Sequence, residues 1–341
     1  MSPSCTSGAA LLPAAVKSNR SGLSAEGKKA LADLTGPRPW AFTGQLFMAW
    51  LVIAGAIAAA VVMAHPLVTV LAILLVATRM NVLGLLVHDQ AHLLGYRHRH
   101  GDTLVNLFAG YPLMVLSVEG YAAVHLAHHR DYFQSTDPDF VRKSGPEWTF
   151  PMPVHRLLRL FLTDILGINT IKLFKGKRAA APNVAFARRH PTPKWVRAVF
   201  LLGLIAVLTF THNWLNFLLF WMLPLVTVLP AIVRWGAICE HRYNLPGASV
   251  EDSTPVIIPG LLGRVLLPNL NFSLHVYHHF HPGVSFANLP RVHAIYEREG
   301  LVDEGNLFRG YLTYWRSLTA MPPGDPAESG DSRVAPVSQF E

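Results

Sequence analysis

Histidine is the residue type in this sequence whose spacing most clearly predicts chemistry. The chain has 17 histidines in 341 residues. Eight of them fall into three clusters: His88 and His92; His125, His128 and His129; and His275, His278 and His279. Residues three or four positions apart lie on one face of a helix, so each cluster can direct its imidazoles at a common point.

These clusters favour metal binding. Neutral imidazole is the commonest metal ligand among the side chains, and it suits zinc, copper, iron and nickel. Because one zinc ion takes about three or four protein ligands, eight histidines predict two metal ions. A surface position or an ordinary hydrogen bond explains a single histidine far better than it explains three helical clusters. The zinc-protease pattern HExxH does not occur in the sequence.

The composition shows what kind of chain must position these histidines. Hydrophobic residues make up 51% of it and charged residues 15%, against about 25% charged residues in an ordinary soluble protein. This balance indicates a membrane protein. The two cysteines, Cys5 and Cys239, exclude a disulfide scaffold and a cysteine-rich metal site. Lipid headgroups explain the net charge of +8 better than nucleic acid does, so we expect no nucleic-acid partner.

Four apolar runs are predicted to cross the membrane. They cover residues 41–64, 67–87, 195–211 and 214–233, and about 20 helical residues span a bilayer. Short breaks at His65-Pro66 and His212-Asn213 join them into two hairpins. Two further runs, 104–118 and 256–270, are shorter and are expected to be buried, re-entrant or interfacial.

The distribution of Lys and Arg predicts the orientation. Residues 1–40 contain five, residues 88–194 contain 14 and residues 234–341 contain eight, whereas the two breaks contain none. The positive-inside rule therefore places both termini and the long loops in the cytoplasm. The Ala- and Arg-rich composition suggests a bacterial inner membrane, with the histidines on its cytoplasmic side.

These observations predict an all-α integral membrane protein. We expect four transmembrane helices in two hairpins, with a cytoplasmic helical cap that holds a di-metal site. Residues 40–315 would form this domain. Residues 1–39 would be a flexible tail and residues 316–341 a disordered one, since both are rich in small residues and proline.

Several motifs resemble those of the membrane fatty acid desaturase superfamily of non-haem di-iron enzymes. The third-cluster region, from Asn271 to His281 with Pro282-Gly283-Val284 and Asn288-Leu289-Pro290-Arg291, is similar to the family's third box. His129-Arg130 followed by Thr136-Asp137-Pro138-Asp139 resembles the stretch after its second box. The similarity extends over roughly residues 40–310. It implies that the eight clustered histidines bind two irons, and that O2 and two electrons drive oxidation of an unactivated C–H bond.

Other residues near the clusters are candidates for supporting roles. Asp89 and Asp137 could orient metal-binding imidazoles, although Asp137 before Pro138 is also a helix-start signal. Asn271 could hold a metal-bound water or make a structural hydrogen bond. The Glu240-His241 pair resembles a family element in which an extra histidine completes the metal shell. The position four before His241 is Ala237, not the Asn of one version of that element. A surface histidine at a helix end is the alternative for His241.

The resemblance leaves several functions open. Desaturation of an acyl or similar aliphatic chain is the leading hypothesis, and a hydroxylase or a fatty acid decarboxylase that forms a terminal alkene is the nearest alternative. The alkane monooxygenase family fits less well, because its first box is usually HExxxH and this chain has HDQAH at residues 88–92. A metal transporter is disfavoured. Transport sites lie near the bilayer midplane, whereas the histidine clusters here lie at or beyond the ends of the predicted spans. We expect a lipid or acyl-chain substrate and a separate electron donor of the ferredoxin, rubredoxin or cytochrome type.

Overall fold

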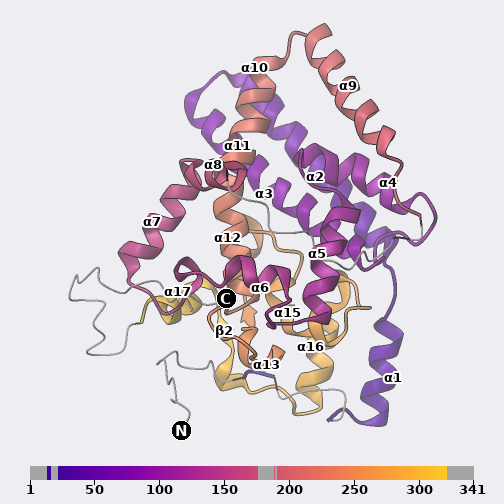
Figure 1. The fold of residues 1–341 in the computed structure, drawn as a ribbon, viewed down its shortest axis with the longest axis vertical. Coiled ribbons are helices and arrows are strands. Elements are labelled where there is room, and N and C mark those ends of the chain that lie inside the picture. Colours follow the sequence, from indigo (N-terminus) through magenta and orange to yellow (C-terminus); the bar gives the residue numbers. More distant parts are fainter. Residues whose placement is uncertain (1–13, 17–21, 176–187, 189, 321–341) are drawn as a thin grey trace.

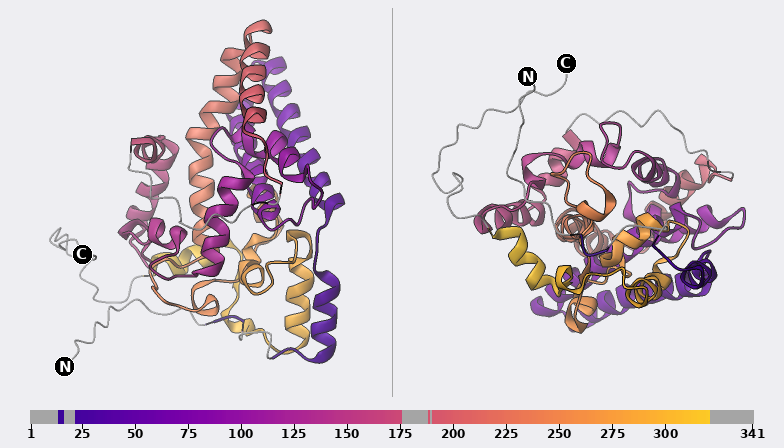
Figure 2. Two further views of the ribbon diagram at one scale, coloured as in Figure 1. Left: turned by 45° about the vertical axis from the view of Figure 1, so that its right-hand side comes forward. Right: turned by 90° about the horizontal axis from the view of Figure 1, so that it is seen from below.

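The computed structural model describes residues 14–16, 22–175, 188 and 190–320, and they are mostly helical (Figure 1). The expected C-terminal tail beyond residue 320, and most of residues 1–21, lie outside this described part. One small parallel sheet pairs β1 (Ile257–Ile258) with β2 (Phe308–Arg309), in the register Ile257 to Phe308. Long helices form a tapering stalk above a base of shorter elements (Figure 2, left).

Three long apolar helices in the described residues could cross a membrane by length and composition. They are α2 (Pro39–Met63), α3 (Pro66–Ala91) and a continuous helical stretch, Trp214–Glu240. This last stretch comprises α10 (Trp214–Phe217), the π-helical η4 (Leu218–Met222), α11 (Leu223–Val226) and α12 (Val228–Glu240). The first two make a hairpin because Ala64 ends α2 in the left-handed conformation and Pro66 starts α3, where its missing N–H costs nothing.

The predicted spans are confirmed only in part. The run at 195–211 forms α9 (Lys194–Phe210), which has 17 residues and is shorter than the three long helices. The run at 104–118 belongs to a bent pair. Its first arm, Gly101–Leu113, contains α4 (Gly101–Val105), the π-helical η1 (Asn106–Gly110) and the 3-10 turn η2 (Tyr111–Leu113). Its second arm is α5 (Val118–Arg130), and the arms meet at 90°, as in a broken span or a re-entrant loop.

The other elements are shorter, and most of them lie in the base, whereas the two helices of residues 154–175 lie beside α11 and α12 (Figure 1). In chain order they are α6 (Pro138–Lys143), η3 (Pro146–Trp148), α7 (Val154–Ile165), α8 (Ile168–Lys175), α13 (Val250–Ser253), α14 (Leu261–Leu266), η5 (Phe272–Leu274), α15 (His275–Phe280), η6 (Phe286–Asn288), α16 (Leu289–Arg298), η7 (Glu304–Asn306) and α17 (Tyr311–Thr319). The run at 256–270, which we expected to be buried, re-entrant or interfacial, contains β1 and α14 in this base.

Helices lie on the tail side of both predicted domain boundaries. Within 1–39, residues Ala25–Leu34 form helix α1, which packs against α16 in the base (Figure 1). Ser24 caps α1 with its side chain, and Glu299 accepts hydrogen bonds from both the Ser24 amide and its hydroxyl. At the other end, α17 continues past residue 315, and the buried Tyr314 donates its hydroxyl hydrogen to the Ile238 carbonyl. Long-range contacts, which composition does not reveal, order both segments.

Burial along α3 increases toward its C-terminal end, which carries the first histidine cluster. The first half of the helix exposes leucines such as Leu67, Leu71 and Leu75, as a lipid-facing surface would. The second half is buried almost completely from Val82 onward and packs against α5 and α12. The end of α3 with the first histidine cluster therefore lies in the packed interior, beside the elements that carry the others.

Candidate metal centre

Four elements bring nine histidines together. The end of α3 supplies His88 and His92, α5 supplies the second cluster, and α15 supplies the third. His241 follows α12 directly, because this helix runs on to Glu240 and does not end near residue 233. The imidazoles converge in two groups of ring nitrogens, although the histidines lie up to 191 residues apart in sequence.

The first group contains His92, His125, His129 and His278, with ligand atoms all within 4.8 Å of one another. The Nε2 atom of His125 lies 2.9 Å from that of His92 and 3.3 Å from that of His278. The Nε2 atom of His129 lies 3.1 Å from that of His125 and 3.0 Å from that of His278. All three clusters thus contribute to this group.

The second group contains His128, His241 and His279. The Nε2 atom of His241 lies 3.3 Å from that of His128 and 3.1 Å from that of His279. Neighbouring histidines in the sequence therefore belong to different groups: His128 and His129 separate, and so do His278 and His279. Successive side chains on a helix point about 100° apart. Two adjacent histidines can therefore bind two different metal ions.

His88 and His275 flank the two groups. The ring centroid of His88 lies 4.1 Å from that of His125 and 4.5 Å from that of His278. The ring centroid of His275 lies 4.7 Å from that of His241 and 4.8 Å from that of His279. Among the described residues, neither ring nitrogen of His88 has a hydrogen-bond partner, and the same holds for Nδ1 of His275 and of His278.

This geometry fits a pair of metal ions. With a metal–nitrogen distance of about 2.1 Å, neighbouring ligands in a tetrahedral or octahedral shell lie about 3.0–3.4 Å apart, close to the observed nitrogen separations. Buried nitrogens without partners are costly in an apolar interior, and metal coordination would remove that cost. The donor set is imidazole alone, which suits Zn, Cu, Fe and Ni and not Ca or Mg.

The electrostatics keep these imidazoles neutral. Burial lowers the pKa of His275, His278 and His279 well below the usual value, and the neighbouring imidazoles lower it further. Burial and then the Arg188 charge lower the pKa of His92 to about 4. A metal ligand must offer a lone pair, which protonation would remove. At neutral pH these rings are therefore in the ligating form.

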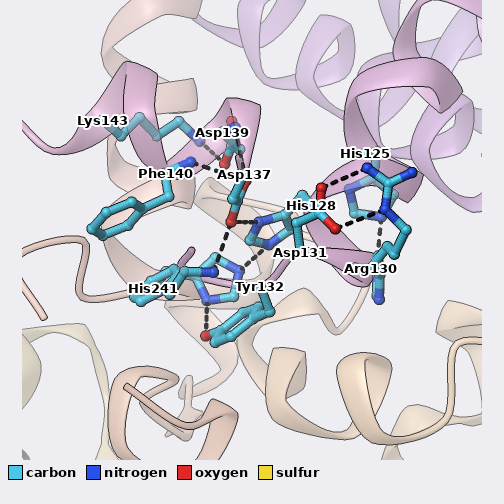
Figure 3. Close-up of polar contacts among 12 residues, drawn as sticks. His125, His128, Arg130, Asp131, Tyr132, Asp137, Asp139, Phe140, Lys143 and His241 are labelled. Atoms are coloured by element: carbon cyan, nitrogen blue, oxygen red, sulfur yellow. Dashed lines mark hydrogen bonds and ion pairs between the residues drawn. The ribbon is translucent and has the colours of Figure 1, made fainter. Parts of the chain in front are cut away.

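Asp137 orients His128 and also starts a helix (Figure 3). One carboxylate oxygen, Oδ2, lies 2.7 Å from Nδ1 of His128 and accepts the Phe133 amide at 2.9 Å. The other, Oδ1, accepts the amides of Asp139 and Phe140 and so caps α6. Because a carboxylate accepts, Nδ1 of His128 carries the proton, and its Nε2 is left with a lone pair that faces the second group. The two roles considered for Asp137 are both present.

His241 is held on its other side by hydroxyl groups. Its Nδ1 lies 3.2 Å from Oγ1 of Thr254 and 3.1 Å from the hydroxyl oxygen of Tyr132. Tyr132 also contacts Ser253 at 2.7 Å. Neither Tyr132 nor Thr254 was predicted from the sequence. Tyr132 lies one helical turn after His128, a spacing that could have suggested it, whereas Thr254 carries no local signal.

Asp89 and Asn271 both bond to the segment at residues 285–286, and for Asn271 this is the structural hydrogen bond considered as one of its two roles. The Asp89 carboxylate accepts hydrogen bonds from the Ser285 hydroxyl and the Phe286 amide, and not from an imidazole. The Asn271 side chain donates to the Phe286 carbonyl at 3.1 Å, and Asn271 itself has a left-handed backbone with φ of 62°. Both residues hold the loop after α15, so they support the third cluster through its backbone.

Arg188 is a further residue that sequence reasoning missed. Its guanidinium pairs with the buried Asp102 at 2.7 Å and donates to the backbone carbonyls of Gln90 and Ala91. The Gln90 side chain also donates to Asp102. These contacts satisfy carbonyls at the end of α3, where helices leave them unpaired, and they fix the turn that carries His92.

Comparison with known proteins agrees with this site. No curated protein matched the chain in the sequence comparison. The family model described as fatty acid desaturase matches residues 64–311, a range that contains all nine convergent histidines. This match covers well over half of the sequence, and the chain therefore belongs to the fatty acid desaturase family.

Proposed function

We propose that this protein is a membrane-bound, O2-dependent oxidoreductase that desaturates a fatty acyl or similar aliphatic chain at a histidine-ligated di-iron centre. The observation that carries the proposal is the pair of converging Nε2 groups, built from imidazoles alone. Membership of the fatty acid desaturase family supports iron among the metals that imidazole suits.

Each group would hold one iron. His92, His125, His129 and His278 would bind the first, and His128, His241 and His279 the second. His88 lies against the first group and His275 against the second, and they would be further ligands. In the described part of the chain, both ring nitrogens of His88 and Nδ1 of His275 lack a hydrogen-bond partner, which supports this role. The bound irons would supply O2 activation and removal of hydrogen from the C–H bond.

The protein's own residues position the ligands and exclude water. Asp137 fixes the tautomer of His128, and Thr254 and Tyr132 fix the ring of His241. The Phe272 ring packs edge-on against His88 at 4.4 Å, and Phe133 packs at 5.7 Å from His241. This apolar packing limits solvent access to the histidines, which protects an oxidation from side reactions with water.

Partners and location follow from the chemistry and from the charge distribution. A lipid or acyl-chain substrate would reach the protein through the membrane. Electrons would come from a separate ferredoxin, rubredoxin or cytochrome-type protein, since the sequence has no cysteine cluster for a built-in centre. The excess of Lys and Arg outside the hairpin breaks supports a cytoplasmic site, in a bacterial inner membrane.

Lipid analysis with metal analysis tests this function. Cells that express the protein should contain a new double bond in their acyl chains or hydrocarbons, and cells that express His128→Ala should not. The purified protein should contain iron. A new alcohol or a terminal alkene in place of the internal double bond would replace desaturation by hydroxylation or decarboxylation. Zinc with no oxidised product would overturn the di-iron oxidase altogether.

A further inference from the structure

Helices α7 and α8 and the turn between them expose much apolar surface, although they lie outside the predicted spans. Six large apolar side chains of this segment are each between 46% and 60% exposed. They are Val154, Leu158, Leu162, Ile165, Leu166 and Ile171, and together they are called the α7–α8 stripe. A soluble protein rarely leaves a large apolar patch open to water unless a partner covers it. The α7–α8 stripe therefore needs an apolar partner.

Helix α7 has three chemically different faces. At about 100° per residue, its four stripe residues fall within one sector of about 80°. The buried Leu157 and Asp164 form a second face, which packs against the protein. The third face is basic and exposed, with His155, Arg156 and Arg159. An exposed apolar face beside a basic one is typical of helices that lie at a membrane interface, where the basic side chains reach the head groups.

A hydrogen bond to the helical stretch Trp214–Glu240 indicates the depth of α8. The Thr170 hydroxyl donates to the Val226 carbonyl at 2.9 Å, and α8 lies beside α11 in the stalk (Figure 1). Val226 follows Trp214 by 12 residues, which is about 18 Å at 1.5 Å per residue. The hydrocarbon core of a bilayer is about 30 Å thick, and tryptophan favours the membrane–water interface. With Trp214 at the far interface, α8 lies at the depth of the hydrocarbon.

An ion pair holds the end of α7 near the edge of this hydrocarbon region. Arg234 of α12 donates through Nε and Nη2 to the buried Asp164 carboxylate, and the Asn169 side chain donates to the same carboxylate at 2.6 Å. Arg234 follows Trp214 by 20 residues, which is about 30 Å along the helix and equals the thickness of the core. Because removing one partner of a buried pair leaves an uncompensated charge, this contact ties α7 to α12 at that height.

We propose that α7 and α8 are immersed in the bilayer leaflet on the side of the histidines, and do not stand in the aqueous phase. The hydrocarbon of that leaflet covers the α7–α8 stripe, and the basic face of α7 lies at the level of the head groups. The apolar surface continues on the neighbouring stretch, where Leu223 and Val233 are 40% and 52% exposed. The inference rests on the membrane location in the proposed function, but it needs neither bound iron nor turnover.

Other partners fit this surface less well. Two copies of the chain that met through the stripe would bring their basic faces together, and like charges repel. A soluble protein would have to reach α8 at the depth of the hydrocarbon. A lipid leaflet supplies an apolar phase against the stripe and phosphates beside Arg156 and Arg159.

Spin labels on single cysteines test this placement in the full-length protein, in nanodiscs of phosphatidylcholine and phosphatidylglycerol. Replacing Cys5 by Ser leaves Cys239, which is buried, and this parent protein gives the labelling background. Labels at Leu162→Cys and Ile171→Cys should collide with O2, which concentrates in hydrocarbon, and lose access to a water-soluble nickel chelate. The matched control is Val141→Cys on α6 in the base, which is 54% exposed. Its label should show the reverse pattern.

A label at Leu71→Cys, on the exposed face of α3, is the reference for lipid contact. If the nickel chelate reaches this label, the membrane location is wrong and the inference fails with it. If the Leu71 label lies in lipid while the labels at residues 162 and 171 are as open to nickel as the Val141 label, the leaflet placement alone is overturned. Labels on the stripe that are shielded from both reagents and broaden one another's spectra would identify a second copy as the cover, which would also overturn it.

Discussion

Replacing Asp137 by Asn should show whether the orientation of His128 controls metal affinity at the second group. The carboxylate accepts four hydrogen bonds, from His128, Phe133, Asp139 and Phe140. An amide has one acceptor oxygen, so either His128 with the Phe133 amide or the helix α6 cap loses its acceptor. When His128 loses this acceptor, its proton is no longer held on Nδ1. The Nε2 atom can then carry the proton, and it no longer offers a lone pair to the second group.

The expected cost follows from the role of such partners. Loss of a group that orients a metal-binding histidine lowers metal affinity about 10–100-fold, which is about 1.4–2.7 kcal/mol. The second group has only three close nitrogens, so it should lose its iron first. Titration of the metal-free protein with iron(II) should therefore show one site weakened by this factor and one unchanged.

Asp139→Asn is the matched control. Asp139 lies two residues away on α6 and pairs with Arg142 and Lys143, and its carboxylate also accepts a hydrogen bond from Tyr243. This variant removes a charge from the same helix without touching an imidazole, so both iron sites should keep their affinity. If Asp137→Asn binds two irons as tightly as the Asp139→Asn protein, the reasoning from tautomer to metal affinity is refuted.

Further predictions concern the whole protein and single positions. Protein purified under mild conditions should contain about two irons per chain, since the convergent imidazoles exceed what one ion can use, and a single zinc would contradict this. His241→Ala should lose turnover and iron while its expression stays normal, whereas the exposed His155→Ala should keep both; full activity of the first variant would remove His241 from the ligands. Reporter fusions at His65 and Asn213 should read as external and a fusion after Lys143 as cytoplasmic, and a cytoplasmic signal at His65 or Asn213 would reverse the topology. Turnover should require O2 and an added redox protein, so repeated turnover with NAD(P)H alone would reveal a built-in reductase.

The local features of the site could be predicted from the sequence because they depend on short-range geometry. Spacings of three and four residues define one helix face wherever the helix lies, and the structure places the second and third clusters on α5 and α15. Long apolar runs likewise predict membrane-crossing helices from composition alone, and three of the four runs became long helices. His241 was identified through its resemblance to a family element, and the structure brings it to the second group.

Assignment of each histidine to a group depended on the tertiary structure. His128 and His129 are neighbours in sequence, yet one approaches His241 and the other His278. The direction of each side chain depends on how α5 is placed relative to α3, α12 and α15, whose histidines it contacts, and no local pattern encodes this placement.

The same limit explains contacts that the sequence did not reveal. Asp89 bonds to Ser285, 196 residues away, and not to a nearby imidazole. Helix α1 forms in a stretch predicted to be a flexible tail, because Ser24 meets Glu299, 275 residues away. Residue types and their spacing thus determined the imidazole donors and the long apolar helices of this protein. Long-range packing decided which side chains meet, because these contacts join segments that only the folded chain brings together.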